Sequence, residues 1–194
     1  MRQLKIFSCA VVAAFVLAIP VGSASATTAT TLDFKGNPVV YTGEIYAPSG
    51  SLELHGPITV TCENARLTSQ IESHGTGVTA AGKVSTLDFE LCSSPVTVLK
   101  AGSLEFHATS GGFATVTSSG AEIKVDNTSL GISCIYTTSN TDIGGFGHFG
   151  GGSFPYISFN SAVIPRTGGS FFCGSSAVLT GGFSITTPSH LSFD

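Results

Sequence analysis

The feature that most constrains this 194-residue chain is the regular alternation of short apolar runs with glycine, serine and proline turns. Ser51–His55 and Ile58–Cys62 each alternate apolar with polar residues, and Gly56-Pro57 separates them. A period of two is typical of strands with one buried face. Turn signals about every 8–12 residues are typical of sandwiches and barrels. The pattern predicts an all-β fold, an antiparallel β-sandwich or barrel of many short strands.

Glycines and serines predict where these strands end. We expect turns at Gly102 and at Ser118-Ser119-Gly120 to separate consecutive strands. From Thr137 to Ser153 we expect a loop, and its glycine-rich part is Gly144–Gly152. Glu63–Ser73 fits neither the helical nor the strand period cleanly.

The N-terminus has the composition of a secretory signal peptide. Basic residues precede the apolar run Ile6–Ile19, and Ala24-Ser25-Ala26 supplies a small-residue cleavage site. The apolar run is shorter than the roughly 20 residues of a membrane span. We therefore expect residues 1–26 to be removed after Ala26. A single all-β domain over residues 27–194 would remain, secreted or at the cell surface and without a transmembrane segment.

Composition and charge exclude several classes of protein. The chain has 42% hydrophobic and 10% charged residues, the reverse of the balance in disordered chains. Without Arg2 and Lys5, six basic residues face twelve acidic ones. Nucleic-acid grooves need clustered basic residues, so we expect no nucleic-acid partner. We expect no cofactor either. A component of the cell envelope or a hydrophobic ligand suits such a chain better.

The cysteines predict two disulfides. An even number of cysteines in an exported chain is typical of a disulfide framework. After cleavage the chain retains Cys62, Cys92, Cys134 and Cys173. Three connectivities are open, and local context favours Cys62–Cys92 and Cys134–Cys173. In each pair the first cysteine follows a strand, and the second ends an aromatic run before a serine turn. Gly168–Pro188 then reads as two strands joined by a glycine turn, with Cys173 in the first.

Two similar segments offer candidate metal ligands. Ser51–His55 and Ser103–His107 both place leucine or phenylalanine on one face of a strand and Glu and His on the other. If the strands were adjacent, Glu53, His55, Glu105 and His107 would share a face on which zinc or calcium could bind. The alternative is that these polar residues simply alternate outward.

An aromatic cluster is the candidate ligand contact. The glycine-rich loop carries Phe146, His148 and Phe149, and Phe154 and Tyr156 follow it. Exposed aromatic rings would present much apolar area to a ligand or a surface. The alternative is a plain connection whose phenylalanines pack back onto the sheet.

The cysteine-bearing segments resemble a family. Cys173–Ala177 and Leu179–Pro188, with Val60-Thr61-Cys62 and Ser133–Tyr136 before them, are similar to small exported bacterial proteins known as alkane-oxidation protein activators. Related uncharacterised exported proteins share the pattern. The resemblance implies an all-β exported protein, linked in some members to hydrophobic substrates or to the cell surface. It implies no catalytic residues. The glycine-rich segment 144–152 departs from the pattern.

Three hypotheses for function follow. The first is a non-enzymatic exported protein with a surface, adhesive or structural role at the cell envelope. It is open to self-association through unpaired edge strands. The second is a binding module for a hydrophobic small molecule or lipid. The third is a metal-dependent or serine hydrolase, which would need Glu53, His55, Glu105 and His107, or a Ser/His/Asp trio, to converge. The chain has no G-x-S-x-G motif, and we expect no enzyme.

Overall fold

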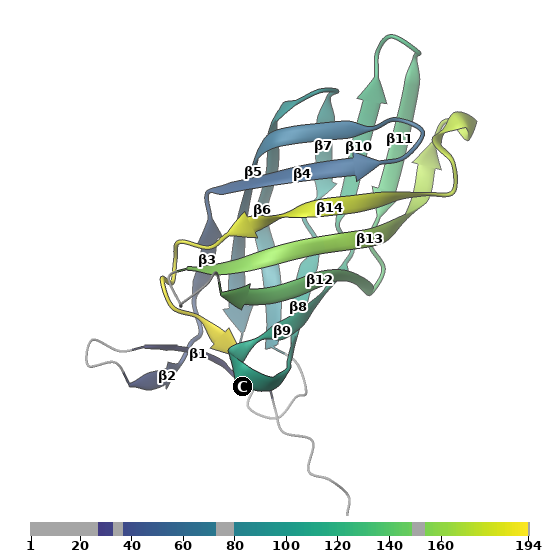
Figure 1. The fold of residues 1–194 in the computed structure, drawn as a ribbon. Helices are drawn as coiled ribbons and strands as arrows, with labels where there is room; N and C mark the ends of the chain where they lie inside the picture. The colour runs from purple at the N-terminus through teal and green to yellow at the C-terminus, as the bar shows by residue number, and fades with distance from the viewer. Residues whose placement is uncertain (1–26, 33–36, 73–79, 149–153, 194) are drawn as a thin grey trace, which may run out of the picture.

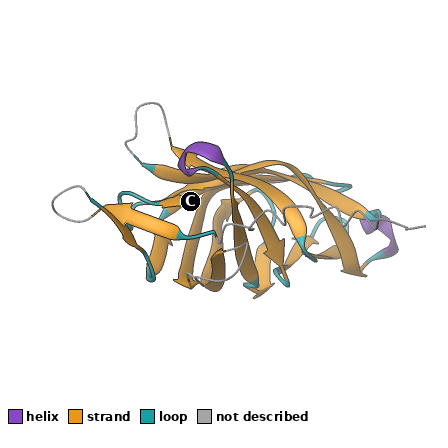
Figure 2. Ribbon diagram, turned by 90° about the horizontal axis from the view of Figure 1, so that it is seen from below, coloured by secondary structure: helices purple, strands orange, loops and turns teal. Residues whose placement is uncertain are grey.

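The computed structural model describes residues 27–32, 37–72, 80–148 and 154–193, and most of them lie in strands (Figures 1 and 2). The predicted signal peptide, residues 1–26, lies outside the described residues. The all-β, antiparallel prediction is confirmed, and the fold is barrel-like. None of the helical segments in the described residues has the length and apolar composition of a membrane span.

The barrel is a ring of antiparallel ladders in the order β4, β5, β6, β8, β9, β12, β13 and β14, and β3 pairs with β5. The pairings β12–β13 and β14–β4 complete the ring. Inward-facing apolar residues alternate with outward polar ones, as at Leu52 and Leu54 of β4. The ring strands are β3 (Glu44–Ala47), β4 (Ser49–His55), β5 (Val60–Glu72), β6 (Ala80–Cys92), β8 (Ser103–Ala108), β9 (Ala114–Ser119), β12 (Thr141–His148), β13 (Pro155–Gly169) and β14 (Ser176–Ser184).

Each of the ring strands β8, β9 and β12 is extended beyond the ring by a separate short strand. The short strands are β7 (Val96–Lys100) before β8, β10 (Glu122–Asn127) after β9 and β11 (Ile132–Thr137) before β12. β7 leads into β8 through Gly102, which has φ 73°, and β9 leads into β10 through Gly120, which has φ 71°. Both glycines therefore separate consecutive strands, as predicted, but each does so as a kink in a continuing strand. A Cβ at Gly102 would lie 2.4 Å from the backbone nitrogen of Ala121, so only glycine fits there.

Two strands change their neighbour where the ring strands kink. β13 pairs with β12 as far as Phe159 and with β11 from Arg166 onward. A bulge between them, with Ser161 at φ 56°, bends the strand. β6 pairs with β8 only over Ala80–Lys83, and its register with β5 shifts just beyond that point. These bends divide the barrel into two parts.

We call these parts the closed half and the open half. In the closed half, β8, β9 and β12 complete the ring of ladders. In the open half, β11, β10 and β7 extend the sheet from β13, and β7 ends as an edge strand. The fully described strands β6 and β7 share no ladder there, although Ser93-Ser94-Pro95 joins them. We call the gap between Thr86–Cys92 and Val96–Lys100 the β6–β7 seam.

A small sheet covers the end of the closed half. It consists of β1 (Ala29–Leu32), β2 (Pro38–Val40) and β15 (Ser192–Phe193). Phe193 stacks on Phe106 with ring centroids 4.5 Å apart and meets the edge of Phe146 at 4.8 Å. All three rings are buried. This packing fills the closed half with apolar side chains.

Three local expectations from the sequence are corrected. Glu63–Ser73, which fitted neither period, falls mostly within the long strand β5. Thr141–His148 of the expected loop is strand β12. Of the stretch Gly168–Pro188, Ser176–Ser184 is a strand as expected, but Phe171–Cys173 forms a 3-10 turn, η2. Ser170 starts this turn because its hydroxyl accepts a hydrogen bond from the Phe172 nitrogen.

Candidate functional site

A cavity of about 80 Å3 lies inside the barrel where the closed and open halves meet. Its wall includes Leu52 and Ile157 from the apolar core of the closed half. It also includes Leu54 and Val125 from the separate apolar core of the open half. None of the described residues that line it is charged. The cavity therefore marks a place where the two cores do not pack against each other.

The cavity wall is incompletely buried at the β6–β7 seam. Leu87 and Phe89 of β6 and Val96 of β7 line the cavity and are only half-buried. Val60 and Ile157, which also line it, are fully buried. β6 and β7 are not joined by a ladder along the seam, and the cavity wall is partly accessible to solvent there.

One polar feature interrupts the apolar wall. Ser118 at the end of β9 and Thr138 after β11 both line the cavity, and both are more than nine-tenths buried. Their hydroxyl oxygens are 3.0 Å apart and hydrogen-bonded. The backbone nitrogen of Ala121 donates to Thr138 Oγ1 at 3.0 Å. These contacts hold both hydroxyls in place at the boundary between the two halves.

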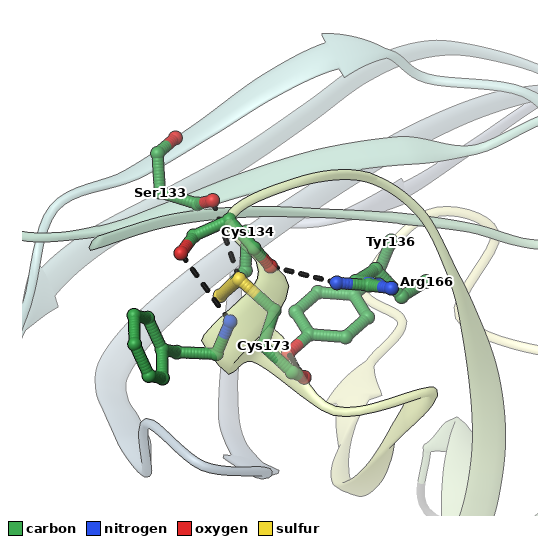
Figure 3. The surroundings of a disulfide bond; sticks show 7 residues. Ser133, Cys134, Tyr136, Arg166 and Cys173 are labelled. Carbon is green, nitrogen blue, oxygen red and sulfur yellow. Dashed lines mark hydrogen bonds between the residues drawn. A yellow bond between two sulfur atoms is a disulfide. The ribbon is translucent and has the colours of Figure 1, made fainter.

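Tyr136 also lines the cavity, but its hydroxyl is already occupied. The O–H donates to the backbone oxygen of Cys173 at 3.2 Å (Figure 3). Burial raises the pKa of Tyr136 above its ordinary value, and the charge of Arg166 partly opposes this shift. The phenol is therefore neutral at physiological pH and acts as part of the wall.

The predicted disulfide Cys134–Cys173 is confirmed and fixes η2 over the end of the open half (Figure 3). The nitrogen of Ser170 donates to the oxygen of Ser133 at 2.7 Å, and Arg166 donates from Nη1 to the oxygen of Ser170 at 2.7 Å. Cys173 is fully buried. The turn is therefore anchored to β11 and β13 at this end of the barrel.

The other predicted disulfide, Cys62–Cys92, is also confirmed. It joins residues that lie directly opposite each other on β5 and β6, with Cα atoms 4.0 Å apart. The nitrogen of Ser93 then donates to the oxygen of Thr61 at 2.9 Å. Residues Thr86–Cys92 of β6 have no ladder partner on the seam side, so this disulfide ties them to β5, their one ladder partner among the described strands.

The structure does not bring the candidate metal ligands together. Glu53 and His55 lie on β4, and Glu105 and His107 lie on β8, with β5 and β6 between these strands. Three strand spacings amount to roughly 14 Å. Each pair forms its own contact on the outer surface, at 3.3 Å and 3.9 Å. The described residues contain no group of three or more His, Cys, Asp and Glu side chains placed to hold a metal ion. These four polar side chains therefore simply alternate outward on their strands, as the alternative prediction had it.

The five aromatic and histidine candidates do not form one surface either. Phe146 is buried in the closed half, so it packs back into the interior, as the alternative prediction had it, and is no exposed ligand contact. His148 and Tyr156 are half-buried and line two different surface hollows. Phe154 is exposed. Phe149 lies outside the described residues.

The glycines that suggested a loop have a different purpose in β12. A Cβ at Gly144 would lie 2.0 Å from the backbone oxygen of Ser158 on β13. Glycine at this position lets β12 approach β13 closely and complete the ring. The glycine-rich composition therefore marks a close strand contact.

Comparison with protein-family models, with curated proteins and with solved structures finds no match. The resemblance to alkane-oxidation protein activators therefore stays a prediction.

Sequence reasoning missed the hydroxyl pair in the cavity wall. One signal was available, because Ala114, Val116 and Ser118 alternate on one face of β9 and all are buried. A serine that continues an inward apolar face is a polar group placed in the interior. Thr138 carries the same signal, because Cys134, Tyr136 and Thr138 alternate on one face of β11 and its continuation and all are buried.

Proposed function

We propose that the mature chain is an exported, non-enzymatic binding protein for a narrow apolar ligand, held in the cavity between the two halves. The observation that carries this proposal is an uncharged cavity whose wall is half-buried at the β6–β7 seam. Barrels of about eight strands are just wide enough to be filled by side chains or to hold one small ligand. The two disulfides are compatible with an oxidising compartment outside the cytoplasm.

The cavity volume sets the size of the ligand. At about 80 Å3 it is smaller than the roughly 150 Å3 engineered cavity that binds benzene. It would enclose a few methylene groups of an alkyl chain, and a longer chain would pass out through the seam. Burial of each methylene contributes about 0.8 kcal/mol, so about three enclosed methylenes with a further one or two along the seam give a Kd in the millimolar range.

The test is titration of the oxidised mature protein with n-hexane, followed by methyl NMR. We expect saturable shifts confined to residues of the cavity wall. Val96→Phe places a ring at the seam and should abolish binding. Val163→Phe makes the same change on the outer face of β13, where Val163 is exposed and does not line the cavity, and should bind as the parent does. No saturable shift in the parent protein would refute the proposal.

A second candidate function is contact with an apolar surface of the cell envelope. It is favoured by the end of the open half, where Phe171 and Phe172 of η2 are 88% and 69% exposed. Leu130, at the tip of the β10–β11 hairpin, is 66% exposed. The stretches Asn127–Ser133 and Thr167–Ser176 contain no charged residue. Protruding rings without adjacent charges suit insertion into a lipid surface.

Co-sedimentation with neutral phosphatidylcholine vesicles tests this second candidate. Phe171→Ser/Phe172→Ser should release the protein from vesicles. Phe113→Ser, which removes an exposed ring at the opposite end, should not. If the parent protein stays in the supernatant, the surface role fails. Self-association through the unpaired edges of β6 and β7 also stays a prediction. Sedimentation of the protein without vesicles tests it.

A further inference from the structure

We propose that the ligand is a neutral alkyl molecule carrying one oxygen, an alcohol or a ketone, and that Ser118 and Thr138 recognise this oxygen. The inference rests on the proposed function, because it assigns a ligand class to the same cavity. Its basis is the hydrogen-bonding capacity that the hydroxyl pair leaves unused.

The two hydroxyls carry two protons, and the bond between them uses one. The bond from the Ala121 nitrogen to Thr138 Oγ1 uses a lone pair and no further proton. One O–H therefore has no acceptor within the described part of the chain, whichever residue donates to the other. Both side chains are more than nine-tenths buried, and both border the cavity.

A buried donor without an acceptor costs about 1–3 kcal/mol. A ligand oxygen in the cavity would accept this proton and remove the cost. Spare lone pairs on the same hydroxyls would accept the proton of an alcohol. The rest of the wall offers only apolar surface and the occupied phenol of Tyr136, so the remainder of the ligand is hydrocarbon.

A carboxylate does not fit this site. No cationic side chain lines the cavity among the described residues. An ionised group taken from water without a partner charge is strongly penalised. The pair of hydroxyls therefore selects a neutral oxygen over a fatty-acid anion.

The test compares n-hexane, 1-hexanol and hexanoate in the parent protein and in Ser118→Ala/Thr138→Val. The lost hydrogen bond should weaken binding of 1-hexanol by about tenfold in the double variant. The double variant should still bind n-hexane at least as tightly as the parent does, because only apolar surface is added to the wall, and this binding reports that the cavity is intact. Hexanoate should bind the parent at least tenfold more weakly than 1-hexanol does.

Each other outcome is informative. If 1-hexanol binds both proteins equally, or if hexanoate binds best, the ligand class is wrong while the binding function stands. If neither n-hexane nor 1-hexanol binds the parent protein, the proposed function itself fails.

A second measurement needs no variant. The carbonyl stretch of 2-hexanone bound to the parent protein should lie at lower wavenumber than in liquid hexane, because it accepts a hydrogen bond. An unshifted stretch on saturable binding would overturn the inference, even if the double variant does not fold.

Discussion

The closed and open halves share the long strands β5, β6 and β13 and differ in what fills them. In the closed half the ladders β6–β8, β8–β9, β9–β12 and β12–β13 follow one another without a gap, and Phe106, Phe146 and Phe193 pack face and edge in its interior. In the open half β6 and β7 share no ladder, and Leu87 and Phe89 stay half-buried. A ring of complete ladders is packed solid, whereas a ring that is interrupted along one seam leaves space. The closed half is therefore expected to contribute most of the stability, whereas the space that we propose for binding lies where the open half begins.

The largest expected effect separates the two halves by stability. Phe106→Ala should lower the free energy of unfolding by about 3–5 kcal/mol, because the ring is fully buried against Phe193. Phe89→Ala also removes a phenyl ring, but a half-buried one in the cavity wall at the seam, and should lower the free energy of unfolding by only about 1 kcal/mol. Urea denaturation of both variants measures the difference. Equal losses would show that the open half is packed as tightly as the closed half.

Removal of a disulfide should be the next largest effect. The two pairs have sequence separations of 30 and 39, so loop entropy predicts nearly equal losses of about 4 kcal/mol each. Reduction of both should lower Tm by roughly 10 °C or more. An unchanged melt after reduction, with free thiols confirmed, would show that the disulfides do not stabilise the fold.

The location of the loss should distinguish the two disulfides. Without Cys62–Cys92, hydrogen exchange should rise in Thr86–Cys92 of β6, which then depends on β5 alone along the seam. Without Cys134–Cys173, exchange should rise in η2. A rise spread evenly over the barrel in both variants would contradict this division.

Two buried serines provide a smaller test of the same comparison. Ser69 lies in the closed half, fully buried, and its hydroxyl has no hydrogen-bond partner within the described chain. Ser69→Ala should therefore raise the free energy of unfolding by about 1 kcal/mol. Ser118→Ala removes a hydroxyl that is bonded to Thr138, and should lower it by about as much. Changes of the same sign would argue against this account.

The smallest effect concerns acid sensitivity in the β10–β11 hairpin of the open half. Hydrogen bonds from Lys124 and then Ser133 lower the pKa of Asp126 below its ordinary 3.8. A lowered pKa contributes stability that is present above the ordinary value and is lost as the pH falls through the folded value. Asp126→Asn should therefore lower stability slightly at neutral pH and flatten the loss below about pH 4. Identical acid transitions in both proteins would disprove this.

The parts of the fold that were predicted correctly depend on local patterns. Alternation at Ser51–His55 identified a strand and its inward leucines, because side chains of a strand alternate whatever it pairs with. The cysteine pairing followed from the similar surroundings of the two pairs. The candidate site was not predicted, because the cavity is bounded by residues from strands across the whole chain.

The differences between prediction and structure share one physical cause. A glycine with positive φ is compatible with a chain reversal and with a kink, and local sequence is the same in both cases. Gly102 kinks because β7 pairs with β10 while β8 pairs with β9. Gly144 extends a strand because β13 lies against it. In each case the partner strand, distant in sequence, decides.

The sequence by itself determined the all-β class, the inward and outward faces of its strands and its two disulfides, since these follow from periodicity and local context. Only the tertiary structure decided which strands close the ring, where the seam lies, and that Ser118 and Thr138 meet in the wall of a cavity. Those features depend on long-range strand pairing and on how two apolar cores meet, and neither is encoded in any short stretch of the chain.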